Sequence, residues 1–494
     1  MLKRIFGAVA RNMKKIMTIG MAMILMCSLL SPVCAEAVAA SLPADGSKAW
    51  ESAEYDGFLI GMPEGWDPQL FTEQTAWLRG IVPEPVISGI YWVKSLQIVQ
   101  ELKKLGLIEF FEPNYYVTLF DDSGNESNGW PYEMLTAEYA ASYSLSGSGV
   151  RIGVIDSGVD SNNFNLQNAN LLQGYNYIQG NTDTDDDVYH GTKVIQVICG
   201  DHNGLGPGGV AAGAEIVPLK CFSSSTGGTV KNIAKAIEDA VDLYQCDIIN
   251  MSWGLSSNVE TLYSSLCYAY GKGVILVAAA GNVTSSYPQG TKIYPAAYQE
   301  VISVSAVNSS LQVLSSSQRN DQVFVCAPGG AVPFVDGNGS VVYDSGTSFA
   351  TPFIAAEIAL LRELAPNLDR DTLMELMVER AVDLGDSGYD TAYGYGLLPL
   401  DVLLGQHWSR FYFSGDDSES MYSVSGWTLN HGGSRALLTS FDDNGRMIEI
   451  QILATEQDRG LFDYSFKEGN ATDYILSFTD PAFIPLAPCD HFSP

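Results

Sequence analysis

The sequence predicts an α/β protein whose central region forms a mainly parallel sheet with helices on both faces. Short apolar runs alternate with helical stretches between about residues 130 and 404, which is the pattern of such a sheet. Hydrophobic residues make up 46% and charged residues 17% of the 494 residues, as in a globular protein. A chain of this length is expected to hold several folding units.

The N-terminus predicts a secretory signal peptide. Five basic residues precede the apolar run 16–30, and small residues around Ala35 and Ala37 suit cleavage. The run is shorter than the roughly 20 residues of a membrane span, although an uncleaved membrane anchor is the alternative. A lipoprotein at Cys34 is disfavoured, because no leucine lies three residues before it. We therefore expect residues 1–37 to be removed, leaving a secreted, extracellular chain with no stable membrane span.

Three parts are expected to follow. Residues 38–128 combine strand-like segments with a helix that begins after Ser95, so they predict a small α+β unit and a polar linker. Residues 129–405 hold the α/β unit. Residues 406–494 alternate aromatic segments with polar turns and predict a small β-sandwich. The expected strands of the first two parts are 55–62, 87–93, 109–120, 150–155, 216–219, 248–251, 274–279, 301–307 and 323–326.

The charge of the chain limits its partners. The first 35 residues hold five of the 26 basic and none of the 57 acidic side chains, so the rest carries a formal net charge of −36. So acidic a surface argues against binding nucleic acid or anionic lipid and suits an extracellular protein.

Cysteines and acidic residues give weaker signals. Six cysteines remain after residue 35, widely spaced and without zinc-binding patterns, so buried free thiols are favoured over a disulfide framework. The acidic segment 183–187 offers oxygen ligands for a structural Ca²⁺ ion, and a solvated loop is the alternative. Metal sites are otherwise unknown.

Three segments of the α/β unit place reactive side chains at the ends of expected elements. Asp156 ends an apolar strand, His190 precedes the helical run 193–199, and Ser348 lies where an apolar helix begins. Taken singly, each side chain is explained as a cap or a turn residue. Together, in the order Asp, His, Ser, they match one of the orders found in serine proteases.

These residue types suit nucleophilic catalysis. A serine hydroxyl is a weak nucleophile until a base accepts its proton. His190 can accept it near neutral pH, because the unperturbed pKa of histidine is about 6.5. Asp156 would orient the imidazole and stabilise the imidazolium.

The three segments resemble the signature blocks of the subtilase family of serine proteases. They are Asp156-Ser157-Gly158, His190-Gly191-Thr192 and the heptapeptide from Gly346 to Pro352, and the likeness covers about residues 130–404. It implies a subtilisin-like fold and a serine endopeptidase that hydrolyses peptide or protein substrates through an acyl-enzyme. The implied catalytic triad is Asp156, His190 and Ser348, and its chemistry requires no cofactor.

The same resemblance implies the binding residues. The segment 278–282 resembles the one that ends in the oxyanion-hole asparagine, here Asn282, and 250–254 resembles the strand that lines the substrate cleft. The implied substrate-binding residues are Ser252, Trp253, Gly254, Ala280 and Gly281. Four positions depart from the family pattern and leave the substrate preference open; they are Tyr189, Lys193, Phe349 and Phe353.

Residues 54–120 resemble the inhibitory propeptide of subtilases, with Glu112-Pro113-Asn114 in the closing strand. The resemblance implies a precursor that inhibits itself and cleaves itself between about Leu119 and Asn128. Two alternatives stay open. One is a catalytically silent subtilase-like binding protein, and the other is a cell-wall or carbohydrate-binding role for residues 406–494, with accessory proteolysis.

Overall fold

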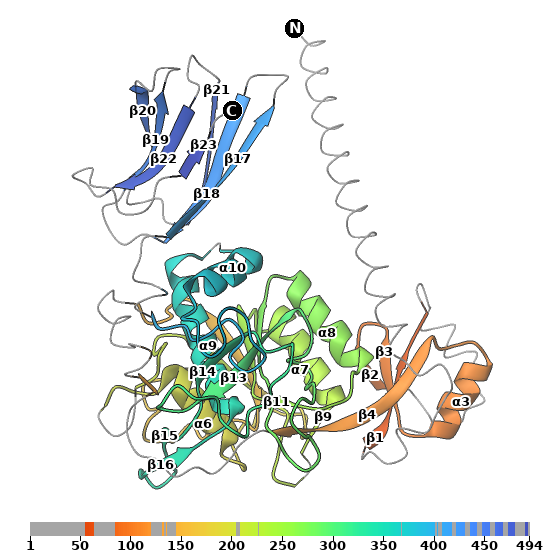
Figure 1. Cartoon of the computed structure of the whole chain (residues 1–494). Helices are drawn as coiled ribbons and strands as arrows, with labels where there is room; N and C mark the ends of the chain where they lie inside the picture. Colours follow the sequence, from red (N-terminus) through yellow and green to blue (C-terminus); the bar gives the residue numbers. More distant parts are fainter. Residues whose placement is uncertain are drawn as a thin grey trace. The chain divides into compact units, whose positions relative to one another are not determined.

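A computed structural model gives the fold (Figure 1). It describes residues 55–63, 84–119, 131–132, 135, 145–203, 208–225, 227–366, 368–400 and 403, together with the backbone of strands between 408 and 492. The predicted signal peptide, the linker after Leu119 and the expected self-cleavage region lie outside the described residues, apart from Leu119 itself.

A parallel sheet forms the centre of the molecule, as the sequence predicts. Its strand order is β14-β13-β12-β10-β5-β8-β6, with β7 also paired to β8, and all of these pairs are parallel. The expected strands are confirmed with ends that differ by at most two residues. The bounds are β5 Arg151–Asp156, β6 Asn170–Leu171, β7 Tyr175–Asn176, β8 Glu215–Lys220, β10 Ile248–Met251, β12 Ile275–Ala279, β13 Val301–Val307 and β14 Val325–Pro328.

Helices cover both faces of this sheet (Figure 1). Neighbouring strand residues face opposite ways, because side chains alternate along a strand. Ile248 packs with helices α6 and α9, whereas Ile249 packs with α7 and α8. The predicted two-faced layering is therefore confirmed. The helix bounds are α6 His190–Cys199, α7 Val230–Asp242, α8 Glu260–Gly271, α9 Thr347–Leu364 and α10 Arg370–Arg380.

The strands before residue 120 form an antiparallel sheet of order β4-β1-β3-β2, with helix α3 packed on its core. The single strand expected over 87–93 is wrong, because a turn at Gly89, where φ is +75°, divides the segment into a hairpin. Glycine adopts such a positive φ without steric cost. The bounds are β1 Tyr55–Gly61, β2 Glu84–Ile87, β3 Ile90–Val93, α3 Leu96–Lys104 and β4 Phe110–Leu119.

Short strands complete the described elements. β9 Gly228–Thr229 and β11 Trp253–Gly254 both pair with β4, and β15 Val332–Val335 pairs with β16 Val341–Asp344. After residue 407, antiparallel strands form two sheets of orders β17-β18-β21 and β20-β19-β22-β23. Packing of these sheets as a sandwich stays a prediction. Their bounds are β17 Trp408–Asp416, β18 Met421–Leu429, β19 Arg435–Phe441, β20 Met447–Ala454, β21 Gly460–Lys467, β22 Asp473–Thr479 and β23 Asp490–Phe492.

Candidate active site

Asp156 is the last residue of β5, at the carboxyl end of a central strand, where α/β sheets hold their ligands. Its side chain is fully buried, and its Oδ1 atom lies 2.7 Å from Nδ1 of His190. The same oxygen accepts the N–H of Ser157 at 2.7 Å. Two predicted site residues, 34 positions apart, are thus brought into direct contact.

His190 is the first residue of α6, which begins three residues earlier than the run expected at 193–199. The carboxylate of Asp186 accepts the N–H of Tyr189 at 2.8 Å and both the N–H and the hydroxyl of Thr192, at 2.8 and 2.6 Å. It therefore satisfies donors that the first turn of a helix leaves unpaired. Tyr189 precedes the helix in a left-handed conformation, with φ +68°, which residues other than glycine rarely adopt.

Gly191 lets the start of α6 approach the end of β5. A Cβ atom at this position would lie 2.3 Å from the carbonyl oxygen of Gly158, so the backbone could not keep its place. The Gly191 N–H donates to Oγ of Ser157 at 2.8 Å. The glycine after the histidine is thus required by the close contact of two backbones.

Ser348 lies in the first turn of α9, and its side chain is buried. Its hydroxyl donates to the carbonyl oxygen of Ser252 at 2.9 Å, while the Ser252 hydroxyl donates to the Ser348 carbonyl at 2.8 Å. The ring of the next residue, Phe349, lies 5.5 Å from the His190 ring, centroid to centroid. The start of α9 therefore lies beside the Asp156–His190 pair.

Asn282 is oriented by the residue before Ser348. Its amide oxygen accepts the N–H and the hydroxyl of Thr347 at 3.1 and 2.9 Å. Its Nδ2 atom is buried and has no hydrogen-bond partner among the residues that the structure describes. An amide held in this way keeps its N–H donors available for another acceptor. Gly281, at φ +97°, turns the chain immediately before it.

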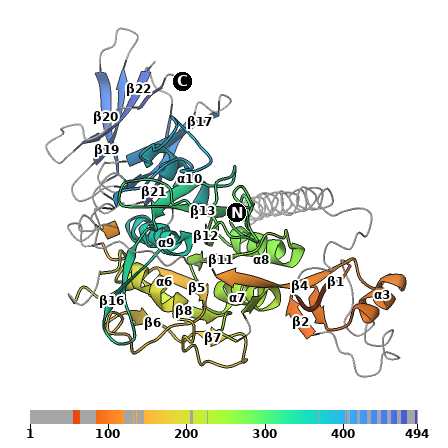
Figure 2. The same ribbon diagram turned by 60° about the horizontal axis from the view of Figure 1, so that its bottom comes forward.

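The predicted binding strand offers its backbone rather than its largest side chain. Trp253 is fully buried, and its indole N–H donates to the carbonyl of Ile155 at 2.9 Å. Its backbone pairs with Leu119 of β4, and Gly254 pairs with Thr118. Strand β4 also pairs with β9, and Figure 2 shows β4 extending from the N-terminal sheet to β11. Strand β4 therefore pairs with two strands of the α/β unit.

The four residues that depart from the family pattern pack into the surroundings of the site. Lys193 forms an ion pair with Asp344 at 2.6 Å and lies 5.8 Å from the ring centroid of Phe349. Phe353 packs edge-on against Tyr132.

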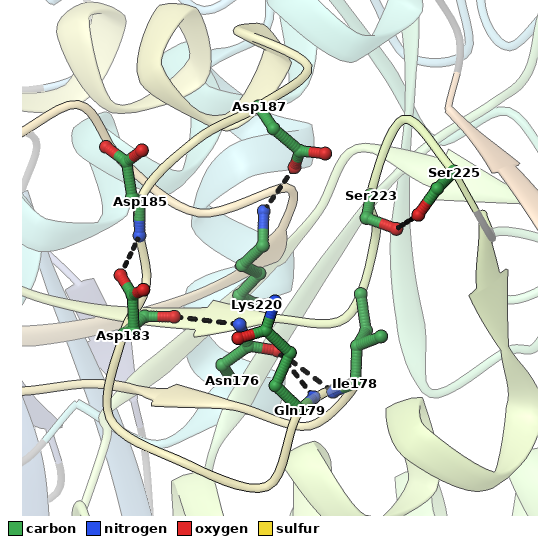
Figure 3. Close-up of a pocket in the computed structure, with 9 residues that line it drawn as sticks. All are labelled: Asn176, Ile178, Gln179, Asp183, Asp185, Asp187, Lys220, Ser223 and Ser225. Carbon is green, nitrogen blue, oxygen red and sulfur yellow. Dashed lines mark hydrogen bonds and ion pairs between the residues drawn. The ribbon is translucent and has the colours of Figure 1, made fainter.

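The acidic segment 183–187 lines a pocket of about 210 Å³ (Figure 3). The Asp186 carboxylate already binds the first turn of α6, and Asp187 forms an ion pair with Lys220 at 2.6 Å. Within the described ranges, no group of three or more His, Cys, Asp or Glu side chains is arranged to hold a metal ion. Calcium at this segment stays a prediction.

The described cysteines are free thiols; they are Cys199, Cys221, Cys246, Cys267 and Cys326. Four of them are buried, and burial raises their pKa, for Cys246 to about 12. Such thiols are chemically inert core residues at neutral pH.

Comparison with known proteins assigns residues 147–396, about half of the chain, to the subtilase family. The chain is 34% identical over 313 residues to the minor extracellular protease Epr of Bacillus subtilis (strain 168), a match that covers 61% of this chain and 47% of that protein. It is 32% identical over 269 residues to subtilisin DY of Bacillus licheniformis, covering 54% and 96%. The chain therefore spans about half the length of Epr and nearly all of subtilisin DY.

The fold and these matches define the class of protein as a serine-type, subtilisin-like endopeptidase. The chain belongs to the subtilase family. Members of this family catalyse their reaction without a cofactor. No helix in the described part of the chain is long and apolar enough to cross a membrane.

Proposed function

We propose that this chain is a secreted endopeptidase that cleaves peptide bonds through an acyl-enzyme, with Ser348 as nucleophile, His190 as base and Asp156 as its partner. The observation that carries the proposal is the 2.7 Å contact between Asp156 and His190 beside the start of α9, where Ser348 lies. The acyl-enzyme splits one difficult hydrolysis into two easier steps.

In the first step the Ser348 hydroxyl attacks the substrate carbonyl carbon, and its proton passes to Nε2 of His190. Asp156 holds Nδ1 and stabilises the imidazolium without taking the proton. His190 then protonates the leaving amine, and in the second step it activates the water that hydrolyses the ester. The hydroxyl is donated to Ser252 in the structure, so we infer that it turns to His190 when substrate binds.

Asn282 and the start of α9 would stabilise the oxyanion that forms in each step. Thr347 holds the oxygen of the Asn282 amide, and no residue that the structure describes accepts a hydrogen bond from its Nδ2 atom. The backbone N–H of Ser348 lies in the first turn of a helix, where amides lack intrahelical partners. Donors placed before the reaction cost no reorganisation when charge develops.

The pairing of β4 supports a role for residues 55–119 as an intramolecular inhibitor. An extended substrate would pair with β11 and β9 in the antiparallel manner that β4 adopts. Side chains of β4 also bind the first turns of two helices in the α/β unit. The Glu112 carboxylate accepts two backbone N–H groups of α8, and the Asn114 side-chain oxygen accepts the backbone N–H of Lys231 in α7. We infer that the precursor occupies its own cleft until it cleaves after Leu119.

Labelling with a fluorophosphonate tests the proposal. The secreted, processed protein should be labelled at Ser348, and the variant Ser348→Ala should be neither labelled nor processed. N-terminal sequencing should place the new end between about residues 120 and 128. Absence of labelling in processed protein would instead support a catalytically silent binding protein. A chain ending near Leu404 that cleaves peptides but loses attachment to cells would assign cell-wall attachment to residues 406–494.

A further inference from the structure

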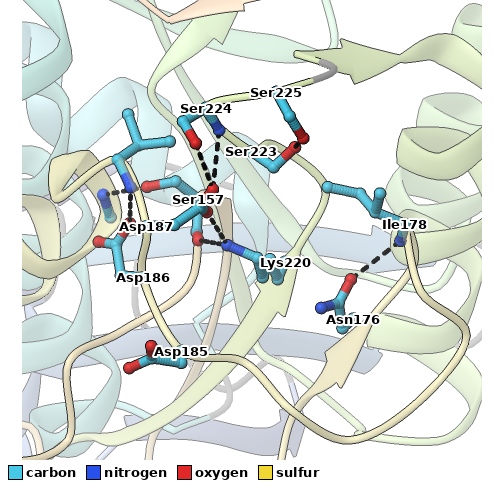
Figure 4. Close-up of polar contacts among 12 residues, drawn as sticks. Ser157, Asn176, Ile178, Asp185, Asp186, Asp187, Lys220, Ser223, Ser224 and Ser225 are labelled. Carbon is cyan, nitrogen blue, oxygen red and sulfur yellow. Dashed lines mark hydrogen bonds and ion pairs between the residues drawn. The ribbon is translucent and has the colours of Figure 1, made fainter.

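Lys220 is a buried cation at the end of β8. In the parallel register of β5 and β8 it lies opposite Asp156, and it is 4% exposed. Its ammonium group donates to the carbonyl oxygen of Ser157 and to Oδ1 of Asp187, both at 2.6 Å (Figure 4). Lysine is almost never buried to this extent unless its charge is paired.

The two partners of Lys220 belong to the segments that carry Asp156 and His190. Ser157 directly follows Asp156, and its three polar groups are all engaged. Its N–H donates to the Asp156 carboxylate, its Oγ accepts the N–H of Gly191, and its carbonyl accepts the Lys220 ammonium. Because Gly191 directly follows His190, Ser157 links the two catalytic segments.

Asp187 gives Lys220 its second link, three residues before His190. Its other oxygen accepts the N–H and the hydroxyl of Ser224, at 3.0 and 2.6 Å. Although partial burial opposes ionisation, hydrogen bonds from Lys220 and Ser224 hold the pKa of Asp187 below its usual range. Asp183 and Asp185 line the same pocket as Lys220 (Figure 3).

We propose that Lys220 is a positioning residue for the Asp156–His190 pair. Its ammonium fixes the end of β5 through Ser157 and the segment leading into α6 through Asp187, so it sets the spacing of the pair. Hydrogen bonds to charged groups are the stronger ones, and a displacement of about 1 Å in a catalytic group can cost about 10²-fold in rate. The inference rests on the proposed function, in which Asp156 and His190 are catalytic.

The variant Lys220→Met, made in the full chain, removes the ammonium and keeps most of the side-chain volume. We expect kcat per titrated active site to fall by about 10- to 100-fold, while KM changes less than about twofold. The acid limb of the kcat/KM pH profile should move to higher pH, because loss of a nearby positive charge favours the imidazolium.

Arg151→Met is the matched control. Arg151 and Glu215 form an ion pair at 2.7 Å at the opposite ends of the same two strands. Its loss should lower thermal stability without changing kcat or the pH profile. Equal losses of kcat in Arg151→Met and Lys220→Met would overturn the positioning role.

A double variant separates positioning from simple charge pairing. Lys220→Met combined with Asp187→Asn removes both charges but still leaves the Ser157 carbonyl without its donor. We expect kcat to stay low in the double variant. Recovery of kcat to the wild-type value would show that Lys220 only neutralises Asp187, and would overturn the proposal. If the single variant does not fold, kcat of the double variant provides the test. If neither variant folds, Lys220 is required for stability alone and the positioning role is overturned.

Fluorophosphonate labelling of the wild type keeps the two proposals distinguishable. If the processed wild type is not labelled at Ser348, the proposed function fails. If it is labelled and Lys220→Met keeps wild-type kcat, only the positioning role of Lys220 fails.

Discussion

The ionisation of Glu112 predicts a measurable dependence of the stability of the protein on pH. Helix α8 begins after Val259, whose side chain cannot cap it, and the Glu112 carboxylate of β4 supplies the cap. It accepts the N–H of Glu260 and that of Thr261, both at 2.8 Å. Desolvation by burial at this contact, aided slightly by the charge of Glu260, outweighs the hydrogen bonds and raises the pKa of Glu112 to about 7.

The sign of the resulting pH dependence follows from this shift. A pKa that rises on folding favours the folded state fully below the unfolded value near 4.5, and this contribution is lost as the pH rises through about 7. The shift corresponds to about 3 kcal/mol, and partial exposure to water reduces the expected effect to about 1–2 kcal/mol. The variant Glu112→Gln, which cannot ionise, should therefore exceed the wild type in stability by up to that amount at pH 8 and by clearly less at pH 5, where the loss has only begun.

Urea unfolding followed by tryptophan fluorescence at pH 5 and pH 8 measures this difference. Both proteins should also carry Ser348→Ala, so that self-cleavage does not remove β4. Glu101→Gln is the control, because Glu101 lies in the same N-terminal unit but its ion pair with Lys104 is exposed. If Glu112→Gln were less stable than its parent at pH 8 and not at pH 5, the ionised cap would outweigh its desolvation, and the reasoning would be refuted.

Three further substitutions test the site and the core. Asn282→Ala should lower kcat by about 10²–10³-fold, which is the loss known for such a donor in a subtilisin, and should change KM little. Steady-state kinetics that find an unchanged kcat would exclude Asn282 from the oxyanion hole. Gly191→Ala should lower the unfolding temperature and the labelled fraction, because its Cβ would lie 2.3 Å from the Gly158 carbonyl; an unchanged protein would contradict that contact. Glu357→Met should raise the unfolding midpoint, more at pH 8 than at pH 5, because burial raises the pKa of Glu357 far above its ordinary value and neither carboxylate oxygen has a partner among the described residues. Calorimetry that finds it destabilising at both pH values would indicate a partner for this carboxyl group.

Local pattern was sufficient for most of the fold around the site. Buried parallel strands are continuous apolar runs, so β5, β10, β12 and β13 could be predicted to within two residues. Patterns with few or interrupted apolar residues were missed, such as the short strand β9 and the turn at Gly89 inside 87–93. The predicted start of helix α6 was three residues too late. Its first turn is stabilised by the carboxylate of Asp186, which accepts the backbone N–H of Thr192. The spacing of apolar residues carries no information about such a contact.

The sequence by itself determined the fold class and the chemical groups, because apolar periodicity and the order of Asp156, His190 and Ser348 are properties of one chain read in one dimension. Only the tertiary structure decided what those groups touch. In the folded chain the Trp253 side chain is buried in the core, and Asp186 and Asp187 bind different partners. Lys220 contacts both the segment that carries Asp156 and the segment that carries His190. Such contacts join residues far apart in the chain, so their distances follow from the packing of whole elements and not from any local pattern.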